Sequence, residues 1–122
     1  MSRYLIKEEI ITLLNLGKPV EAFLGRLSDD EEILTWISLE KSKENQIVLN
    51  INEVYDEGSL DYLDIYDFSF VDSDMDFETL EFADLENAIE FIKDRFKFTE
   101  CKFLTKGVIQ DEYKKLLLTE GA

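Results

Sequence analysis

The chain has 122 residues, a mass of 14.3 kDa and a formal net charge of −15, with 28 acidic residues against 13 basic ones. Its length fits one domain over residues 1–122, and a hydrophobic fraction of 45% excludes a disordered acidic tail. Because histidine is absent and Cys101 is the single cysteine, a Ser-His-Asp triad, an internal disulfide and a cysteine-rich zinc site are excluded.

Residues 1–30 predict a helical hairpin that covers one face of a sheet. Ser2 is a suitable N-cap for a helix over residues 3–16, and Gly17 is its expected end. Apolar residues recur along it at helical spacing: Ile6, Ile10, Leu13 and Leu14. Pro19 fits the first position of a second, shorter helix that runs to about residue 27.

The middle of the chain predicts four antiparallel strands. Residues 33–39 and 47–55 are rich in β-branched and apolar residues and form an expected β-hairpin. A turn over residues 56–59 follows, in which Gly58 is free to take positive φ. Residues 60–71 alternate as a third strand, and residues 77–82 form a fourth. On the third strand one side is shared by Tyr62, Asp64, Tyr66, Phe68 and Phe70.

Two helices are predicted near the C-terminus. Asp84 is the N-cap of the first, whose apolar stripe is Leu85, Ala88, Ile89, Ile92 and Phe96. Residues 102–104 form a short strand or link, Gly107 interrupts the pattern, and residues 111–119 form the last helix. The expected fold is therefore α+β: an N-terminal helical hairpin, a four-stranded antiparallel β-meander and two C-terminal helices packed on the sheet.

The negative charge is concentrated in the middle of the chain. Between Lys43 and Lys93 there are 15 acidic residues and no Lys or Arg, so the two ends together are neutral. A segment without cations disfavours nucleic acid as a ligand and favours a basic protein partner. Tyrosines lie among these acids, as they do at the centres of protein interfaces.

Neither a calcium-binding pattern nor a catalytic pattern is complete in this sequence. The spacing of Asp72, Asp74 and Asp76 is that of the start of a calcium-binding loop. However, Phe77 stands in place of the glycine that makes the turn, and Ala83 in place of the glutamate that closes the site. We therefore expect an acidic surface loop, and whether it binds a cation stays open. Acid pairs suited to glycosidase chemistry would arise by chance among 28 acids, so we expect no enzyme, no metal and no cofactor.

The N-terminal apolar stretch contains charged residues, and no run approaches the ~18 apolar residues of a membrane span. We therefore expect no membrane association and a cytoplasmic location, which also suits a lone thiol.

Three segments, YDEGSLDYLDIYDF, LEFADLENAIEFIKDRF and GVIQDEY, resemble sequences of small acidic immunity proteins from bacterial polymorphic-toxin and contact-dependent inhibition systems. The resemblance extends over about residues 48–117. It implies a non-enzymatic protein that binds one cognate toxin domain, often a nuclease, and blocks it.

The surface expected to bind the partner consists of Asp56, Glu57, Asp61, Tyr62, Asp64, Tyr66 and Asp67. The alternative is a small cytoplasmic adaptor or regulatory module whose acidity serves only solubility. Pairing of two copies through an aromatic-rich edge strand also stays open.

Overall fold

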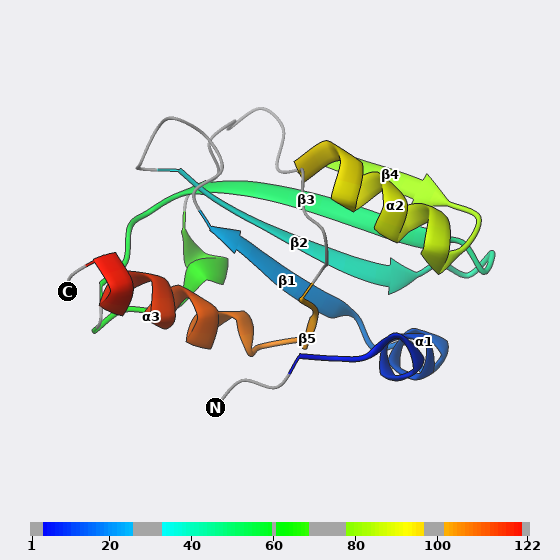
Figure 1. Cartoon of the computed structure of the whole chain (residues 1–122), viewed down its shortest axis with the longest axis horizontal. Coiled ribbons are helices and arrows are strands. Elements are labelled where there is room, and N and C mark those ends of the chain that lie inside the picture. Colours follow the sequence, from blue (N-terminus) through cyan, green and yellow to red (C-terminus); the bar gives the residue numbers. More distant parts are fainter. Residues whose placement is uncertain (1–3, 26–32, 60, 69–77, 97–101, 121–122) are drawn as a thin grey trace.

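The computed structural model describes residues 4–25, 33–59, 61–68, 78–96 and 102–120. Within them lies a five-stranded antiparallel sheet with the spatial order β4-β3-β2-β1-β5 (Figure 1). Its strands are β1 (Val20–Gly25), β2 (Ile33–Lys41), β3 (Ile47–Tyr55), β4 (Glu78–Phe82) and β5 (Leu104–Thr105). The helices are α1 (Lys7–Asn15), α2 (Leu85–Phe96) and α3 (Ile109–Glu120). The α+β class is confirmed, but the sheet has one strand more than predicted.

The segment predicted as a second helix is β1. It pairs antiparallel with β2 on one side and with β5 on the other. Val20 and Ala22 face one core cluster and Phe23 packs against the other, so the residues alternate as in a strand buried on both faces. Pairing along both edges outweighs the helical spacing of the apolar residues. The helical hairpin expected at the N-terminus is therefore wrong.

The predicted β-hairpin is confirmed as β2 and β3. The two strands pair without interruption from Ile33↔Tyr55 to Lys41↔Ile47. Their alternation places Leu39 of β2 and Leu49 of β3 in one apolar cluster and Leu34 of β2 in another. β4 then pairs with the free edge of β3, and this confirms the described part of the predicted fourth strand.

The third predicted strand does not form in its described part, residues 61–68. This segment contains a one-residue bridge between Ser59 and Tyr62 and the 3₁₀ turn η1 (Ile65–Asp67). Because β2 and β4 already occupy both edges of β3, the segment packs against a face of the sheet instead. Ile65 and Phe68 are both buried, and their separation of three residues suits a 3₁₀ turn. The predicted common side for Tyr62, Asp64, Tyr66 and Phe68 is therefore wrong.

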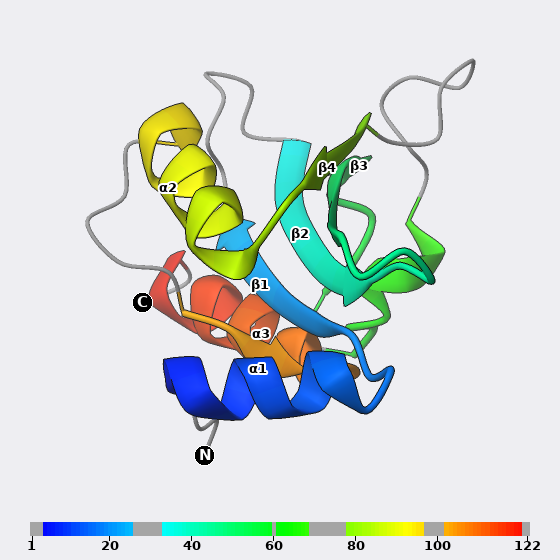
Figure 2. The same ribbon diagram turned by 90° about the vertical axis from the view of Figure 1, so that its right-hand side faces the viewer.

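Two apolar clusters lie on opposite faces of the sheet. On one face α1 and α2 pack over residues that include Ile37, Leu39 and Leu49. On the other face α3 and η1 pack over residues that include Leu34 and Trp36. Figure 2 shows α2 and the green 3₁₀ turn on opposite sides of the curved sheet. The helices thus divide between the two faces.

The first helix is shorter than predicted. It begins at Lys7, and Ile6, which we expected in its apolar stripe, is 57% exposed. The Glu9 carboxylate accepts a hydrogen bond from the Ile6 backbone N–H at 3.1 Å, which satisfies one free donor of the first turn. The predicted cap Ser2 lies outside the described residues. Gly17 has φ 78° just beyond the helix, as its expected end requires.

The two C-terminal helices are confirmed. Asp84 Oδ1 accepts a hydrogen bond from the Asn87 backbone N–H at 2.9 Å, the expected N-cap of α2. Ile92 of α2 and Tyr113 of α3 are fully buried. Gly107 precedes α3 with φ 94°. Among the described residues, no helix has both the length and the apolar character needed to cross a bilayer.

Candidate functional site

The seven residues predicted to bind a partner lie in one loop, described over residues 56–59 and 61–68, which we call the acidic loop. It leaves the end of β3, turns back through two hydrogen bonds between the backbones of Ser59 and Tyr62 (2.9 and 3.0 Å), and ends beyond η1. Figure 1 shows the green 3₁₀ turn beside α3. Tyr62, Asp64 and Tyr66 are brought together by a folded loop and not by the strand alternation that we expected.

Most of the charged groups of the acidic loop face solvent. Glu57, Asp61 and Asp64 are exposed, and Asp64 accepts a 3.4 Å hydrogen bond from the side chain of Gln110 in α3. Tyr62 and Tyr66 add large side chains that are 40% and 36% exposed. The side chain of Asp67 lies outside the description. The loop therefore presents carboxylates and phenols together.

Asp56 has a different environment, because its carboxylate faces the body of the protein. Its Oδ1 atom accepts a hydrogen bond from the hydroxyl of Tyr113 in α3 and lies 3.4 Å from the Gly58 backbone nitrogen. Tyr113 is fully buried. Asp56 thus anchors the start of the acidic loop to α3.

A second anchor joins the end of the loop to the sheet. Glu21, the second residue of β1, is only 3% exposed, and it accepts hydrogen bonds from the Tyr66 hydroxyl and, at 3.2 Å, from the Gly107 backbone N–H. The same N–H lies 2.9 Å from the Tyr66 oxygen. Burial and then the hydrogen bond to Glu21 raise the pKa of Tyr66 above its ordinary value. The phenol therefore stays protonated and remains a donor.

Aromatic contacts complete the attachment of the loop. The ring of Tyr66 meets the ring of Trp36 on β2 edge to face, with centroids 5.3 Å apart. Phe68 contacts both Tyr62, at 5.7 Å, and Tyr113, at 5.6 Å. The two exposed tyrosines of the acidic loop, Tyr62 and Tyr66, therefore pack against the buried rings of Phe68 and Trp36.

Gly58 is required for a reason that differs from the prediction. It does not have the expected positive φ. A Cβ atom at this position would lie 2.5 Å from Phe68 Cζ, 2.5 Å from the Tyr62 carbonyl oxygen and 2.7 Å from the Tyr113 hydroxyl. Glycine therefore permits close packing of the loop against itself and α3.

The sequence predicted the charged residues of this site but not its anchors. Glu21 was missed because its segment was interpreted as a helix, in which a glutamate suggests a solvated face. As a strand, the pattern Val20-Glu21-Ala22 places one carboxylate among buried residues, and an acid in a buried strand is the signal that would have identified it. Tyr113 of the predicted last helix is fully buried, but no local pattern indicates its hydrogen bond to Asp56.

The described residues contain no group of three or more acidic or thiol side chains placed to hold a metal ion. The Asp72-Asp74-Asp76 segment and Cys101 lie outside the described residues.

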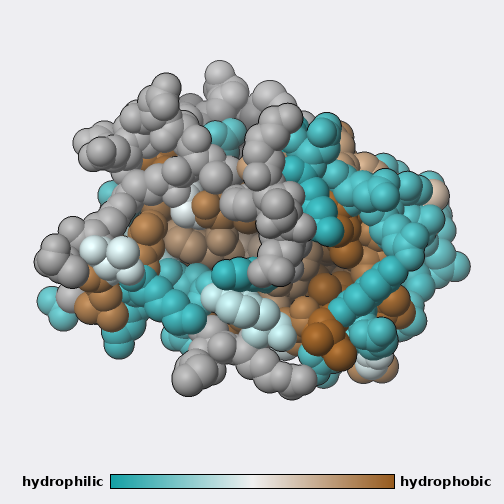
Figure 3. Space-filling view, viewed as in Figure 1, coloured by the Kyte–Doolittle hydropathy of each residue, from teal (hydrophilic) through white to brown (hydrophobic). Residues whose placement is uncertain are grey.

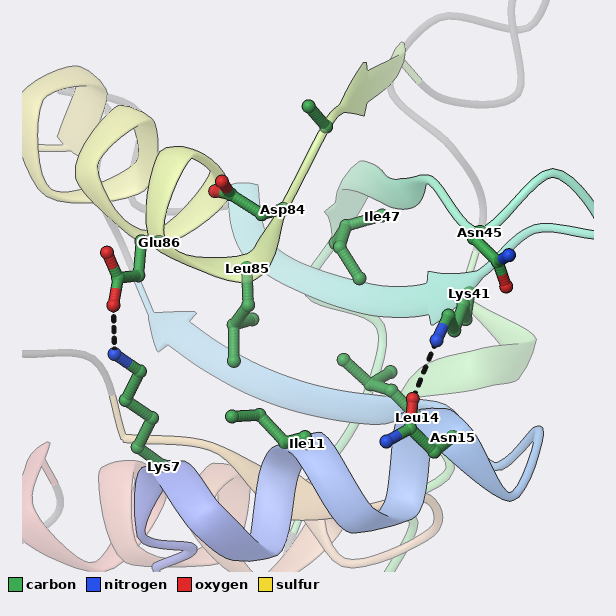
Figure 4. Close-up of a pocket in the computed structure, with 11 residues that line it drawn as sticks. Lys7, Ile11, Leu14, Asn15, Lys41, Asn45, Ile47, Asp84, Leu85 and Glu86 are labelled. Carbon is green, nitrogen blue, oxygen red and sulfur yellow. Dashed lines mark hydrogen bonds and ion pairs between the residues drawn. The ribbon is translucent and has the colours of Figure 1, made fainter.

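A pocket of about 520 Å³ lies elsewhere, between α1, α2 and the end of the β2–β3 hairpin (Figure 4). Its walls include the apolar side chains of Ile11, Leu14, Ile47 and Leu85. The space-filling view shows brown apolar atoms exposed among teal polar ones in this part of the molecule (Figure 3). The sequence analysis did not anticipate this pocket, because it depends on how two helices distant in sequence are spaced.

No protein-family model, no curated protein and no solved structure matches this chain significantly.

Proposed function

We propose that this protein is a non-enzymatic binding protein that neutralises a basic partner, and that it acts as an immunity protein against a cognate toxin domain through its acidic loop. The observation that supports this most is the combination of the exposed carboxylates of Glu57, Asp61 and Asp64 with a loop fixed at both ends. The proposal gives the protein no catalytic step.

Charge supports a basic partner. The chain carries a net charge of −15, and all of the excess falls between Lys43 and Lys93, the segment that contains the acidic loop. Such a surface attracts a cationic protein at long range and raises the rate of association. A nuclease domain is the target class that fits best, because its cleft must be basic to hold a polyanionic substrate.

The rigidity of the loop supports tight binding. Ordering a loop on association costs free energy, and a loop that is ordered beforehand avoids that cost. Tyr66 is held by Glu21 and Trp36, and Asp56 is held by Tyr113. Exposed tyrosines over buried rings are typical anchors of protein interfaces. Carboxylates in the loop supply attraction, and Tyr62 and Tyr66 supply contact area.

The test uses the product of the neighbouring gene, because an immunity protein is encoded beside its toxin. Its toxin domain is purified, and the association rate is measured by stopped-flow at 0.05 and 0.5 M NaCl. Steering predicts that the rate falls by at least about tenfold at the higher salt concentration. Co-expression with this chain should also restore growth to cells that make the toxin. A neighbouring product that does not bind, or a rate that is independent of salt, would overturn the proposal.

A pair of charge-matched variants locates the surface. One carries Glu57→Lys, Asp61→Lys and Asp64→Lys; the other carries Glu8→Lys, Glu44→Lys and Glu90→Lys, which are equally exposed but lie outside the acidic loop. Both triples change the net charge by the same amount. We expect the first to weaken toxin binding by at least about a hundredfold and the second by less than about tenfold. Equal losses would indicate that only net charge matters and that the acidic loop is not the binding surface.

A further inference from the structure

The pocket between α1 and α2 has an apolar interior with a polar bridge at each end. Figure 4 shows Ile11 and Leu14 of α1 and Leu85 of α2 pointing into the gap between the helices. Ile11 is 41% exposed, which is unusual for an isoleucine on a helix that covers a core. The volume of about 520 Å³ lies within the usual range of small-molecule sites. The pocket thus offers uncovered apolar surface of suitable size.

The two bridges differ in charge. At one end Lys7 Nζ forms a 2.5 Å ion pair with Glu86 Oε1, so this end is neutral. At the other end Lys41 Nζ donates a 2.6 Å hydrogen bond to Asn15 Oδ1, which is an uncharged amide oxygen. Among the described residues, no carboxylate forms an ion pair with Lys41. The hairpin end of the pocket therefore carries an ammonium group that forms no ion pair with a described carboxylate.

The remaining acid of the pocket does not change this asymmetry. Asp84 caps α2 by accepting a hydrogen bond from the Asn87 N–H, and in Figure 4 its carboxylate points away from the gap. Lys41 belongs to the apolar face of β2, opposite Ile47, so its aliphatic stem lines the pocket while its ammonium reaches the rim. Asn45, at the same rim, offers a further amide.

We propose that this pocket binds a small organic carboxylate with an aliphatic or single-ring body. The carboxylate accepts hydrogen bonds from the ammonium of Lys41 and from the amide groups of Asn15 or Asn45. The body covers the side chains of Ile11, Leu14 and Leu85. This inference is independent of the proposed function, because the pocket and the acidic loop share no residue. Charge complementarity at Lys41 selects an anion over a cation of the same shape.

The test compares three probes that share one body: hexanoate, hexylammonium and 1-hexanol. Each is titrated into ¹⁵N-labelled protein in 0.15 M NaCl, which screens the net negative charge beyond about 8 Å. We expect hexanoate to shift the backbone amide signals of Lys41, Asn45 and Leu85 saturably. Hexylammonium and 1-hexanol should bind at least about fivefold more weakly. Absence of saturable shifts, or equal affinity for the three probes, would overturn the proposal.

Two lysine variants distinguish the pocket from general charge. Lys41→Gln keeps a polar group of similar length and should remove the preference for hexanoate over 1-hexanol. Lys43→Gln makes the same chemical change at an exposed position of the same hairpin outside the pocket, and should leave the preference intact. If Lys41→Gln binds hexanoate as well as the wild type does, the carboxylate does not bind at Lys41 and the proposal fails.

Discussion

Among the described residues, three tyrosine hydroxyls donate hydrogen bonds to carboxylates: Tyr4 to Glu112, Tyr66 to Glu21 and Tyr113 to Asp56. The chain has 28 acidic residues against 13 basic ones and no histidine, so many carboxylates must be satisfied by donors other than cations. A phenol can satisfy a carboxylate oxygen while its ring packs in the apolar core. Tyrosine therefore replaces the salt bridge at the points where the acidic loop is attached.

Replacing Tyr66 with Phe should destabilise the protein by about 1–3 kcal/mol, because the buried Glu21 loses a donor. Urea unfolding followed by the fluorescence of Trp36, the single tryptophan, measures this directly, since Tyr66 packs on that ring. Tyr55→Phe is the matched control: Tyr55 is 39% exposed, and its hydroxyl has no hydrogen bond in the described part of the chain. Equal effects of the two substitutions would contradict the anchoring role.

The same tyrosine predicts a pH dependence in the alkaline range. Burial and Glu21 raise the pKa of Tyr66 above the ordinary value of 10.0, so above pH 10 the unfolded chain loses a proton that the folded protein keeps. The free energy of unfolding must then fall as the pH rises. Urea titrations between about pH 9 and 11 should show a steeper fall for the wild type than for Tyr66→Phe. Parallel curves would mean that Tyr66 ionises equally easily in both states.

Replacing Gly58 with Ala should destabilise the protein through steric clashes. The Cβ atom of Gly58→Ala would contact three groups at 2.7 Å or less, two of them parts of buried Phe68 and Tyr113. We expect a loss of about 1–3 kcal/mol in the free energy of unfolding. Gly17→Ala is the comparison, because Gly17 has a positive φ but open space around it, so only the backbone cost of about 1 kcal/mol applies. A Gly58→Ala variant as stable as the wild type would show that the loop is not packed as described.

At the scale of the element, α2 should contribute to stability mainly through Ile92. This side chain is fully buried against the sheet, so Ile92→Ala should cost about 2–5 kcal/mol. Ile11→Ala changes the same residue type on α1, but that side chain is 41% exposed and should cost much less. Thermal or urea unfolding of both variants compares them. Similar losses would indicate that the wall of the pocket is as tightly packed as the core.

The elements that could be predicted are those whose local pattern agrees with their tertiary surroundings. Only one secondary structure fits each of three patterns: the apolar stripe of α2, its N-cap Asp84 and the alternation of β3. β1 does not, because a short apolar run fits a helix and a doubly buried strand equally well. The strand prediction for residues 61–68 is wrong for a topological reason. The residues alternate as in a strand, but β2 and β4 already pair with both edges of β3.

For the whole molecule, the sequence could predict where the charge lies but not how the site is held. The absence of Lys and Arg between Lys43 and Lys93 is visible without coordinates. The bond between Tyr66 and Glu21 joins residues 45 positions apart, and that between Tyr113 and Asp56 joins residues 57 apart. Such contacts depend on the order of the strands and the position of α3, which no local pattern encodes.

The net charge of −15 also predicts how the whole molecule responds to salt. Repulsion among the carboxylates destabilises the compact state at low ionic strength, and salt screens it. The melting temperature should therefore rise when NaCl is increased from about 0.01 to 0.15 M, by about 4 °C for each kcal/mol of repulsion relieved. Neutralising the acidic loop with Glu57→Gln, Asp61→Asn and Asp64→Asn should raise the melting temperature at low salt and flatten this response. Differential scanning calorimetry measures both. A melting temperature that falls with salt would mean that attractive charge pairs outweigh the repulsion. A triple variant with an unchanged salt response would mean that the repulsion does not arise in this loop.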